Sequence, residues 1–292
     1  MSAFMQFLDT ILKPMVLVFT VSNLFAMGLQ VKMPEVIAAL KNIKSMALIF
    51  VWGWVLAPAL GYLIIWILPL AESFVIVVLL SSLAPCAPIV PLMVLRARGD
   101  VSFAGAFIPL VMIGAVVFIP LIGPLMVKGL AVNSVDLAIP LLLQILLPLA
   151  IGIAVRHYAR TAATKIFPAV NVFARLITLL MITETFVLFA QPMLEILGSF
   201  ALLAATIHVG GMMLITYRFG FGLKQGQRSV MALGNGTRNL AAILAAAFAI
   251  PNVDPRIITF IMMWGLWSFV LAAIGARIYG KQAGKTDAGN TI

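Results

Sequence analysis

Residues 81–95 read SSLAPCAPIVPLMVL, and this stretch decides which kind of helical protein the chain forms. It lies in an apolar segment long enough to cross a membrane, yet Pro85, Pro88 and Pro91 fall within seven residues of it. Each proline lacks a backbone N–H, and its ring collides with the preceding turn of a helix. A regular helix therefore cannot pass through this segment, and we predict a helix that is broken in its middle.

A second apolar segment is interrupted differently, by residues 232–244, which read ALGNGTRNLAAIL. Two glycines surround an asparagine here, and glycine is the poorest helix former after proline. An arginine and another asparagine follow at once. The sequence therefore predicts two broken helices, over about 73–95 and 229–250.

The whole chain is too apolar for a protein in water. Of its 292 residues, 63% are hydrophobic and 10% are charged, whereas a soluble domain carries about 25% charged residues. A soluble fold of this size has no way to hide so much apolar surface. We predict an all-α polytopic membrane protein, which excludes a soluble enzyme, a disordered chain and a disulfide-stapled secreted domain.

Stretches without a formal charge give most of the membrane spans, because about 20 apolar residues cross the hydrocarbon. Seven such stretches run over 14–31, 45–71, 73–95, 101–127, 137–155, 196–217 and 257–276. Two more apolar segments hold buried charges: 166–192 contains Arg175 and Glu184, and 229–250 contains Arg238. The total of nine spans is odd, so the two termini are predicted on opposite sides of the membrane.

The distribution of Lys and Arg predicts how the chain is oriented in the membrane. Of the 19 Lys and Arg residues, only Lys13, Lys128 and Arg256 lie in loops of one side, and nearly all others lie on the opposite side. Cytoplasmic loops are rich in Lys and Arg, so we predict a cytoplasmic C-terminus, with a tail over about 280–292, and an external N-terminus. The net charge of +10 then requires no nucleic-acid partner.

The two predicted breaks lie five spans apart, so their helices run in opposite directions. Irregular backbone at membrane depth is tolerated only inside protein or beside a water-filled cavity. Two such segments at matching places in two halves are typical of a transporter binding site. The alternative is that proline and glycine merely kink ordinary membrane helices, where both are common. A buried arginine at one break favours an inverted repeat with two crossed broken helices.

The residues at these breaks resemble the bile acid:sodium symporter family. The similarity covers most of the chain and is carried by LFAMGLQVK at 24–32, APAL at 57–60, PCAPIVPLMVLRARGD at 85–100, His208, and GNGTRNLAAILAAAF at 234–248. The family implies ten helices built as five plus five, divided into a core and a panel domain, with substrate and ions bound where the broken helices cross. This chain resembles members that lack the first helix. The resemblance places its third, fourth, seventh, eighth and ninth spans in the core, and the other four in the panel.

The sequence departs from the family at the sodium sites. Sodium-coupled members carry P-G-G-T-x-S-N in the first broken helix, where this chain has PCAPIVP at 85–91, and E-x-G-x-Q-N in the second, where it has GNGTRN at 234–239. Gly234 thus replaces the sodium-binding carboxylate and Arg238 replaces a glutamine. Three further polar positions of the family fall at Gly53, Ala104 and Ile108. Two like charges about 5 Å apart in a poorly screened site repel by several kcal/mol, so we expect no sodium coupling at the usual sites.

Arg238 is predicted to stand in for the cation and to hold a small organic anion, because guanidinium binds carboxylate or sulfate through two parallel hydrogen bonds. The other predicted substrate-binding residues lie beside it at the two breaks: Cys86, Pro88, Pro91, Gly234, Asn235, Gly236, Thr237 and Asn239. The amides that open the resumed helix add to this site. We predict no metal site, no cofactor and no enzymatic activity, because no nucleophile–base or dicarboxylate set is present.

Two ionisable residues inside the spans are candidates for proton coupling. Glu184 lies about half a turn from Arg175 around its helix, so the two are not expected to pair. It either carries a coupling proton or donates one hydrogen bond between helices. His208 can sense protons, although a packing role near the site fits it better. Arg175 is expected to reach the membrane interface through its long side chain.

The sequence therefore predicts one transporter domain over 1–292, in the bilayer of a bacterial cytoplasmic membrane, which moves a small organic anion by alternating access. Three alternatives stay open. The first is a sodium-coupled symporter that uses backbone ligands. The second is an arsenite-type efflux carrier, because the more distantly related arsenite carriers place a cysteine at the position of Cys86 and thiolate is a soft ligand. The third is a channel or scaffold that does not transport, for which Arg238 would have no purpose.

Overall fold

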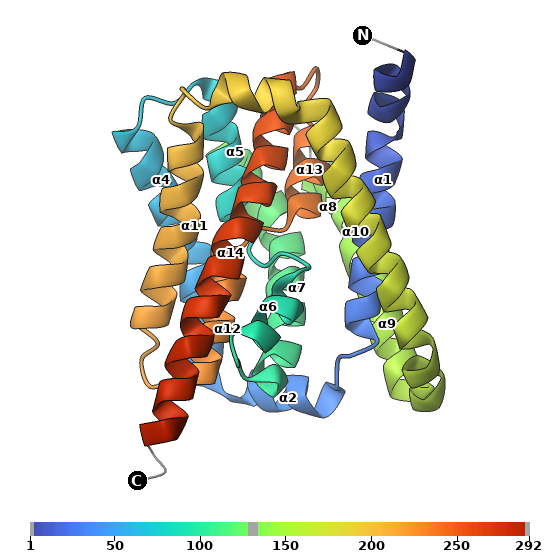
Figure 1. The fold of residues 1–292 in the computed structure, drawn as a ribbon, viewed down its shortest axis with the longest axis vertical. Coiled ribbons are helices and arrows are strands. Elements are labelled where there is room, and N and C mark those ends of the chain that lie inside the picture. Colours follow the sequence, from blue (N-terminus) through green and yellow to red (C-terminus); the bar gives the residue numbers. More distant parts are fainter. Residues whose placement is uncertain (1–2, 128–133, 290–292) are drawn as a thin grey trace.

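The computed structural model describes residues 3–127 and 134–289, and within these ranges the chain is helical without strands. The helices, shown in Figure 1, are α1 (Ala3–Gly28), α2 (Met33–Lys41), α3 (Ile43–Phe50), α4 (Ala57–Ile67), α5 (Glu72–Ser82), α6 (Val90–Arg96), α7 (Val101–Met126), α8 (Ser134–Leu141), α9 (Leu147–Tyr158), α10 (Arg160–Ile196), α11 (Ala201–Arg218), α12 (Gln225–Gly236), α13 (Leu240–Phe248) and α14 (Pro255–Gly289).

Two π-helical segments, Val51–Leu56 and Leu142–Leu146, join α3 to α4 and α8 to α9 into continuous rods. A proline, Pro58 or Pro148, stands in the first turn of the helix that follows each segment. Because proline supplies no N–H to the ladder of hydrogen bonds, the preceding turn widens instead of closing in the α pattern.

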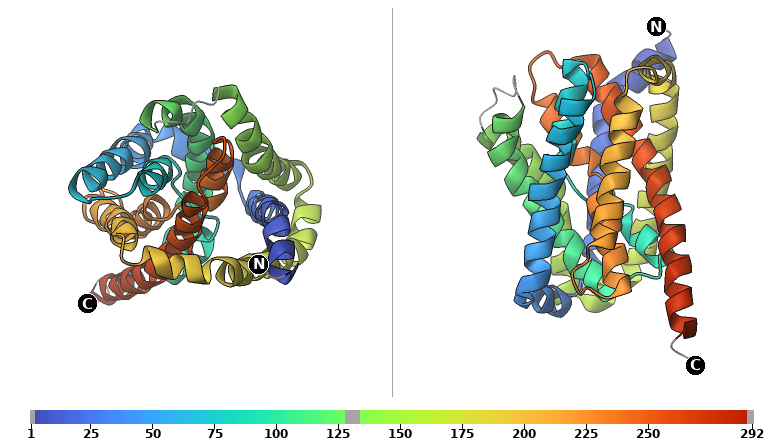
Figure 2. Two further views of the ribbon diagram at one scale, coloured as in Figure 1. Left: turned by 90° about the horizontal axis from the view of Figure 1, so that it is seen from above. Right: turned by 90° about the vertical axis from the view of Figure 1, so that its left-hand side faces the viewer.

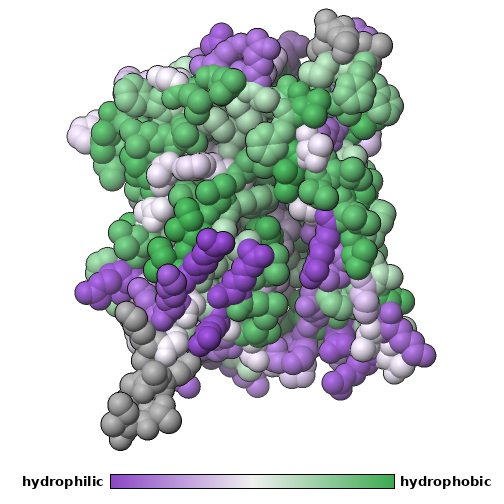
Figure 3. Space-filling model, in the orientation of Figure 1, coloured by the Kyte–Doolittle hydropathy of each residue, from purple (hydrophilic) through white to green (hydrophobic). Residues whose placement is uncertain are grey.

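Seven rods in the described residues are long and apolar enough to cross a membrane: Phe4–Gly28, Ile43–Ile67, Val101–Met126, Ser134–Tyr158, Arg160–Ile196, Ala201–Arg218 and Pro255–Gly284. They coincide with every predicted span except the two broken ones. Figure 3 shows the apolar side chains as a wide band between more hydrophilic ends, as an integral membrane protein requires. Because segments 72–96 and 225–248 are each divided into two shorter helices, the count of nine spans stays a prediction.

The helices gather into two groups. One group consists of α1, α9 and α10, which pack closely on one another, together with α8, which continues into α9 through Leu142–Leu146 and also packs against α7. The other contains α3 to α7 and α11 to α14. Viewed from above in Figure 2, α1, α9 and the first part of α10 lie on one side, and α4, α5, α11 and α12 lie on the other; the last part of α10 crosses from the first side toward α11.

The placement of residues 45–71 in the panel is wrong, because α4 packs against α5 and α11 in the larger group. Small residues explain this packing. Gly61 lies so close to Ser82 that an added Cβ would stand 3.3 Å from the serine Cβ. Hydrophobicity alone marks this segment as a span, but only the small buried face of α4 shows which helices it contacts.

The connections and ends of the chain complete the arrangement. Helix α2 lies across one end of the bundle, links α1 to α3, and packs against α7 (Figure 1). Helix α1 begins at the opposite end from the one where α14 finishes. Helix α14 continues through Gly289, so the predicted tail over 280–292 is helical as far as the structure describes it. Lys128, which was assigned to the external side, lies outside the described residues.

Candidate functional site

The two interrupted segments meet at their breaks. Residues 83–89 separate α5 from α6, and residues 237–239 separate α12 from α13. The backbones of Pro85 and Arg238 face each other as an isolated antiparallel bridge. Three backbone N–H groups close this crossing: Cys86 donates to the carbonyls of Gly234 (2.9 Å) and Thr237 (3.0 Å), Asn239 donates to Ala84 (2.9 Å), and Ala87 donates to Thr237 Oγ1 (3.1 Å). The backbone N–H groups of Cys86, Ala87 and Asn239, which the breaks leave outside a helix, therefore have hydrogen-bond partners, as burial at membrane depth demands.

Two glycines allow the second interrupted helix, α12, to pack closely against α7 and α11 at the crossing. A Cβ on Gly234 would overlap the ring of Phe107 in α7, and a Cβ on Gly236 would overlap the side chain of Met213 in α11. The family resemblance predicts that Gly234 replaces a sodium ligand. The structure adds a second reason for glycine, because no larger residue fits against α7.

Arg238 is the most unusual residue of the crossing. Its side chain has no exposed surface. Its Nη2 lies 3.1 Å from Nδ1 of His208 in α11, whereas Nε and Nη1 have no hydrogen-bond partner among the described residues. The single ion pair in those residues joins Lys32 to Glu35. Within the described part of the chain, Arg238 is thus a buried cation without an acidic partner, a state that is costly and uncommon in proteins.

His208 connects this cation to α4. A guanidinium can only donate hydrogen bonds, so Nδ1 of His208 must accept the bond from Arg238. The proton of the neutral ring then lies on Nε2, which donates to the carbonyl of Ala57 at 3.1 Å. The ring also packs edge-on against Trp264, with 5.6 Å between centroids. Both ring nitrogens are engaged, so the geometry favours the packing role of His208 and leaves no nitrogen free for a coupling proton.

Other buried polar atoms surround the crossing without partners among the described residues: both amide atoms of Asn235, Nδ2 of Asn239 and Oγ of Ser81. Asn235 also lies beside Gly53, where an added Cβ would be 3.5 Å from Oδ1. Buried polar groups are normally hydrogen-bonded. Their concentration here distinguishes the crossing from the apolar core around it.

The predicted substrate-binding residues have different access to solvent. Pro88 and Pro91 are half-buried. The others are buried inside the crossing: Cys86, Gly234, Asn235, Gly236, Thr237, Arg238 and Asn239. In this conformation, therefore, the two prolines form the accessible face of the crossing, and the remaining residues form its interior.

Cys86 holds a strained position in that interior. Its φ is +74°, a region that residues other than glycine seldom adopt. The thiol is fully buried, and its contact to the carbonyl of Ala87 is long, at 3.9 Å. The side chain behaves as a small apolar group that fills space in the crossing.

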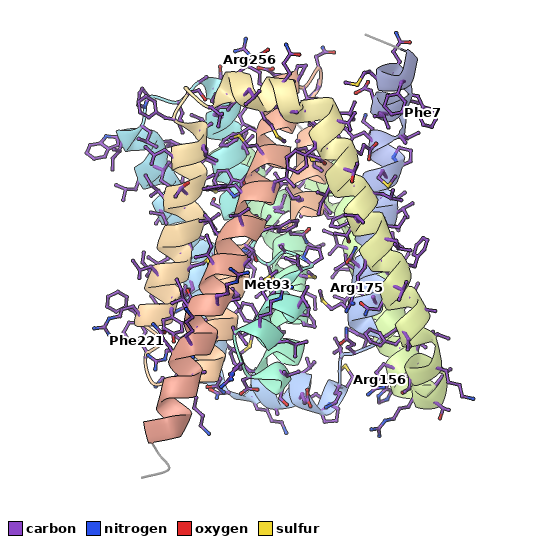
Figure 4. The ribbon with its side chains drawn as sticks, in the orientation of Figure 1. Phe7, Met93, Arg156, Arg175, Phe221 and Arg256 are labelled. Carbon is purple, nitrogen blue, oxygen red and sulfur yellow. The ribbon has the colours of Figure 1, made fainter. Side chains whose placement is uncertain are left out.

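Glu184 lies away from the crossing, in α10. It is 5% exposed, and neither carboxylate oxygen has a partner among the described residues. It forms no ion pair with Arg175, since the described chain holds only the pair of Lys32 and Glu35. Arg175 is exposed, and Figure 4 labels it about midway along α10.

A cavity of about 350 Å³ reaches the accessible face of the crossing. It lies between α1, α2, α9 and α10 on one side and α6 and α7 on the other. Pro91, Ala104 and Ile108 belong to its apolar wall, and the last two are positions where the family resemblance places hydroxyl groups. Its polar lining consists of Gln30, Lys32, Glu35, Ser102, Arg156 and Thr164.

Analysis of the sequence missed this polar lining. Lys32 and Arg156 were counted only as loop charges that set the orientation. No local pattern connects Lys32 with Arg156, because the two line the same cavity only through the packing of distant helices. The pairing of Arg238 with His208 was missed for the same reason, since thirty residues separate them.

Two interrupted helices that meet inside a bundle of apolar membrane helices define the architecture of a secondary transporter. The sequence model of the sodium bile acid symporter family matches residues 15–196, which is more than half of the chain. The chain therefore belongs to the sodium bile acid symporter family, whose members are transporters. The match includes the first interrupted segment and ends before the second. No curated protein matches the chain.

Proposed function

We propose that this protein is a secondary carrier that moves a small organic anion by alternating access and does not bind sodium at the usual sites of its family. The observation that carries the proposal is Arg238, a fully buried guanidinium whose single protein partner in the described residues is His208. Isolated buried charges are costly. A protein that served only as a scaffold would gain nothing by keeping one at the crossing.

Electrostatics support the absence of sodium. A sodium ion about 5 Å from a guanidinium, at an effective dielectric constant of about 20, is repelled by about 3 kcal/mol. This repulsion corresponds to a loss of affinity on the order of a hundredfold. Arg238 thus acts as a fixed cation in the larger group of helices, and His208 holds it in place.

The burial of Arg238 refines the role that the sequence predicts for it. Its charge attracts the anion toward the crossing, while the substrate lies in the cavity against Pro91. Two unit charges about 10 Å apart at an effective dielectric constant of about 20 attract by about 1.7 kcal/mol. The buried neighbours Asn235, Thr237 and Asn239 hold the crossing and become substrate contacts only when the helix groups separate.

The proposed movement takes place between the two groups of helices. The seven continuous spans and the two interrupted segments would make nine, with the C-terminus in the cytoplasm and the N-terminus outside a bacterial cytoplasmic membrane. The group of α1 and α8 to α10 would serve as the panel. The cavity opens between this panel and the larger core, at the end of the bundle where α2 lies.

The test is the thermal unfolding of the purified full-length protein with a panel of small organic anions, in sodium chloride and in choline chloride. We expect one class of anion to stabilise the protein equally in both salts. Arg238→Gln should weaken binding of this anion by about 20-fold, the equivalent of the attraction of about 1.7 kcal/mol, and Arg175→Gln, which changes an exposed arginine, should leave it unchanged. A response of unchanged strength in Arg238→Gln would refute the assignment.

The same measurement separates the alternatives. A response only in sodium would favour a sodium-coupled carrier with backbone ligands. A response to arsenite that Cys86→Ala abolishes would favour an arsenite carrier. No response to any anion would favour a channel or scaffold.

Glu184 is the proposed coupling group if transport is driven by protons, because its carboxylate is buried and unpaired among the described residues. Glu184→Gln should then remove the dependence of uptake on an imposed pH gradient. Uptake that follows the gradient equally well in the variant would exclude this role.

A further inference from the structure

Basic side chains gather where the end of α6 meets the last third of α14. Arg96 ends α6 and Arg98 follows it, while Arg277 and Lys281 lie one turn apart in α14. The side chains of these residues are exposed, and none of them forms an ion pair with another described residue. The place therefore carries four positive charges that no acid in the described part of the chain neutralises.

Two glycines of α14 bring the end of α6 against this helix. An added Cβ on Gly280 would stand 2.6 Å from the backbone carbonyl oxygen of Arg96. An added Cβ on Gly284 would stand 3.1 Å from Nη1 of Arg98. The backbone of α6 thus lies directly on α14 at Gly280, and the guanidinium of Arg98 lies beside Gly284.

Three of the basic side chains share one face of α14. Arg277 and Lys281 are four residues apart, and Gly284, beside which the guanidinium of Arg98 lies, follows Lys281 by three residues. Residues three and four apart are neighbours on the surface of a helix. Figure 3 shows hydrophilic side chains gathered over the lower half of α14, below the apolar band. The charges are therefore concentrated on one strip of the surface.

An exposed apolar stripe continues this strip toward the middle of the membrane. Val270, Ile274 and Ile278 follow one another at intervals of four residues, and all three are exposed. Arg277 lies about 33 Å along α14 from Pro255, because an α-helix rises 1.5 Å per residue, and the hydrocarbon of a bilayer is about 30 Å thick. This length places Arg277 at the level of the lipid headgroups and the apolar stripe among the acyl chains.

We propose that this face of α14, together with the end of α6, binds one anionic phospholipid from the leaflet on the side of the C-terminus. The headgroup phosphate accepts charge-assisted hydrogen bonds from Arg277, Lys281 and Arg98, and an acyl chain lies along Val270 and Ile274. Anionic lipids attract clusters of basic residues at the cytoplasmic surface of a membrane. The site thus matches both halves of the lipid, its charge and its apolar chain.

The general excess of Lys and Arg on the cytoplasmic side does not account for this arrangement. That excess sets the orientation of the chain, but it does not require several basic side chains on one helix face directly below an exposed apolar stripe. A bound lipid would contact α14 and the end of α6 together, and it would stabilise the arrangement in which they touch. Because Val94 and Leu95 of α6 line the cavity, the lipid would also hold one wall of that cavity in place.

The experiment measures lipid binding to the purified full-length protein in a nonionic detergent by native mass spectrometry. The probes are phosphatidylglycerol, phosphatidylcholine with the same acyl chains, and inorganic phosphate as a competitor. We expect phosphatidylglycerol to bind more tightly than phosphatidylcholine and to resist displacement by inorganic phosphate. The double variant Arg277→Gln, Lys281→Gln should bind phosphatidylglycerol about 30-fold more weakly, because each basic residue at a membrane surface contributes about fivefold in affinity.

The matched control is the double variant Arg160→Gln, Lys165→Gln. It removes two exposed basic residues from the start of α10, at the end of the bundle where α14 finishes, and it should bind phosphatidylglycerol as the unaltered protein does. Thermal unfolding without lipid shows whether each variant is folded. If the double variant of α14 does not fold, Arg277→Gln and Lys281→Gln alone should each weaken binding about fivefold.

Four results would each overturn the inference. They are an unchanged affinity for phosphatidylglycerol when the charges of α14 are removed, an equal loss in the α10 control, equally tight binding of phosphatidylcholine, and displacement of the lipid by inorganic phosphate. The proposed function would stand in every case, because Arg277 and Lys281 lie outside the crossing and outside the cavity lining.

Discussion

Two substitutions of His208 separate its two hydrogen bonds and test how the buried arginine is held. Asparagine places a carbonyl oxygen near the position of Nδ1, so His208→Asn keeps an acceptor for Arg238. Glutamine places an amide N–H near the position of Nε2, so His208→Gln keeps a donor to the carbonyl of Ala57. Both variants lose the contact between the imidazole ring and Trp264, which removes that contribution from their comparison.

The structure predicts which variant has the lower free energy of unfolding. Glutamine loses the bond to the guanidinium, about 1.5–3 kcal/mol, and leaves Arg238 without a protein partner, about 1–3 kcal/mol more. Asparagine loses the bond to Ala57, about 0.5–1.5 kcal/mol, and one more methylene of packing, about 0.8 kcal/mol. We therefore expect the free energy of unfolding of His208→Gln to be about 2 kcal/mol lower than that of His208→Asn.

The assay is denaturant unfolding of both variants in the same detergent, followed by tryptophan fluorescence. The unaltered protein provides the reference. If His208→Asn is as unstable as His208→Gln, or less stable, then Nδ1 does not accept the bond from Arg238. The description of Arg238 as a fixed cation held by a neutral histidine would then be wrong.

Three further predictions concern single residues. Gly234→Ala should lower the free energy of unfolding by about 1–3 kcal/mol, because its Cβ would overlap the ring of Phe107. Gly210→Ala in α11 is the control, because nothing lies within 4 Å of an added Cβ; it should leave the free energy of unfolding unchanged or raise it by up to about 1 kcal/mol. Equal losses of stability in the two variants would contradict the close packing of Gly234 against Phe107. Cys86→Gly should be tolerated, because glycine adopts the positive φ of +74° without strain. A large loss of stability in thermal unfolding would show that the thiol packs more tightly than its contacts indicate. Glu184→Gln should leave the melting temperature nearly unchanged, since no partner in the described residues is lost; a marked fall would mean that the ionised carboxylate is structural.

Local chemistry explains what the sequence alone can predict. Pro85, Pro88 and Pro91 remove three helical N–H donors within seven residues, so a break after α5 follows from the chain itself. The more widely spaced prolines of α7 are tolerated inside a continuous helix. The length of the apolar segments likewise indicates membrane helices without reference to their neighbours. These features depend on residues within one or two turns of each other.

Contacts between distant segments explain what the sequence leaves open. The span at 45–71 is apolar all round, so its membership of the larger group depends on Gly61 and on the carbonyl of Ala57, which His208 reaches from α11. The burial of Arg238 follows from the same packing. The polar lining of the cavity depends on α2 placing Glu35 beside Lys32 and on α9 bringing Arg156 to the same cavity. None of these arrangements leaves a periodic signal in the chain.

The most direct test of the central claim compares the affinity of the unaltered protein for one stabilising organic anion in sodium chloride and in choline chloride at equal ionic strength. A fixed cation at Arg238 predicts the same dissociation constant in both salts. Binding that occurs only in sodium would contradict the account, because the crossing would then hold a sodium ion in spite of the buried arginine.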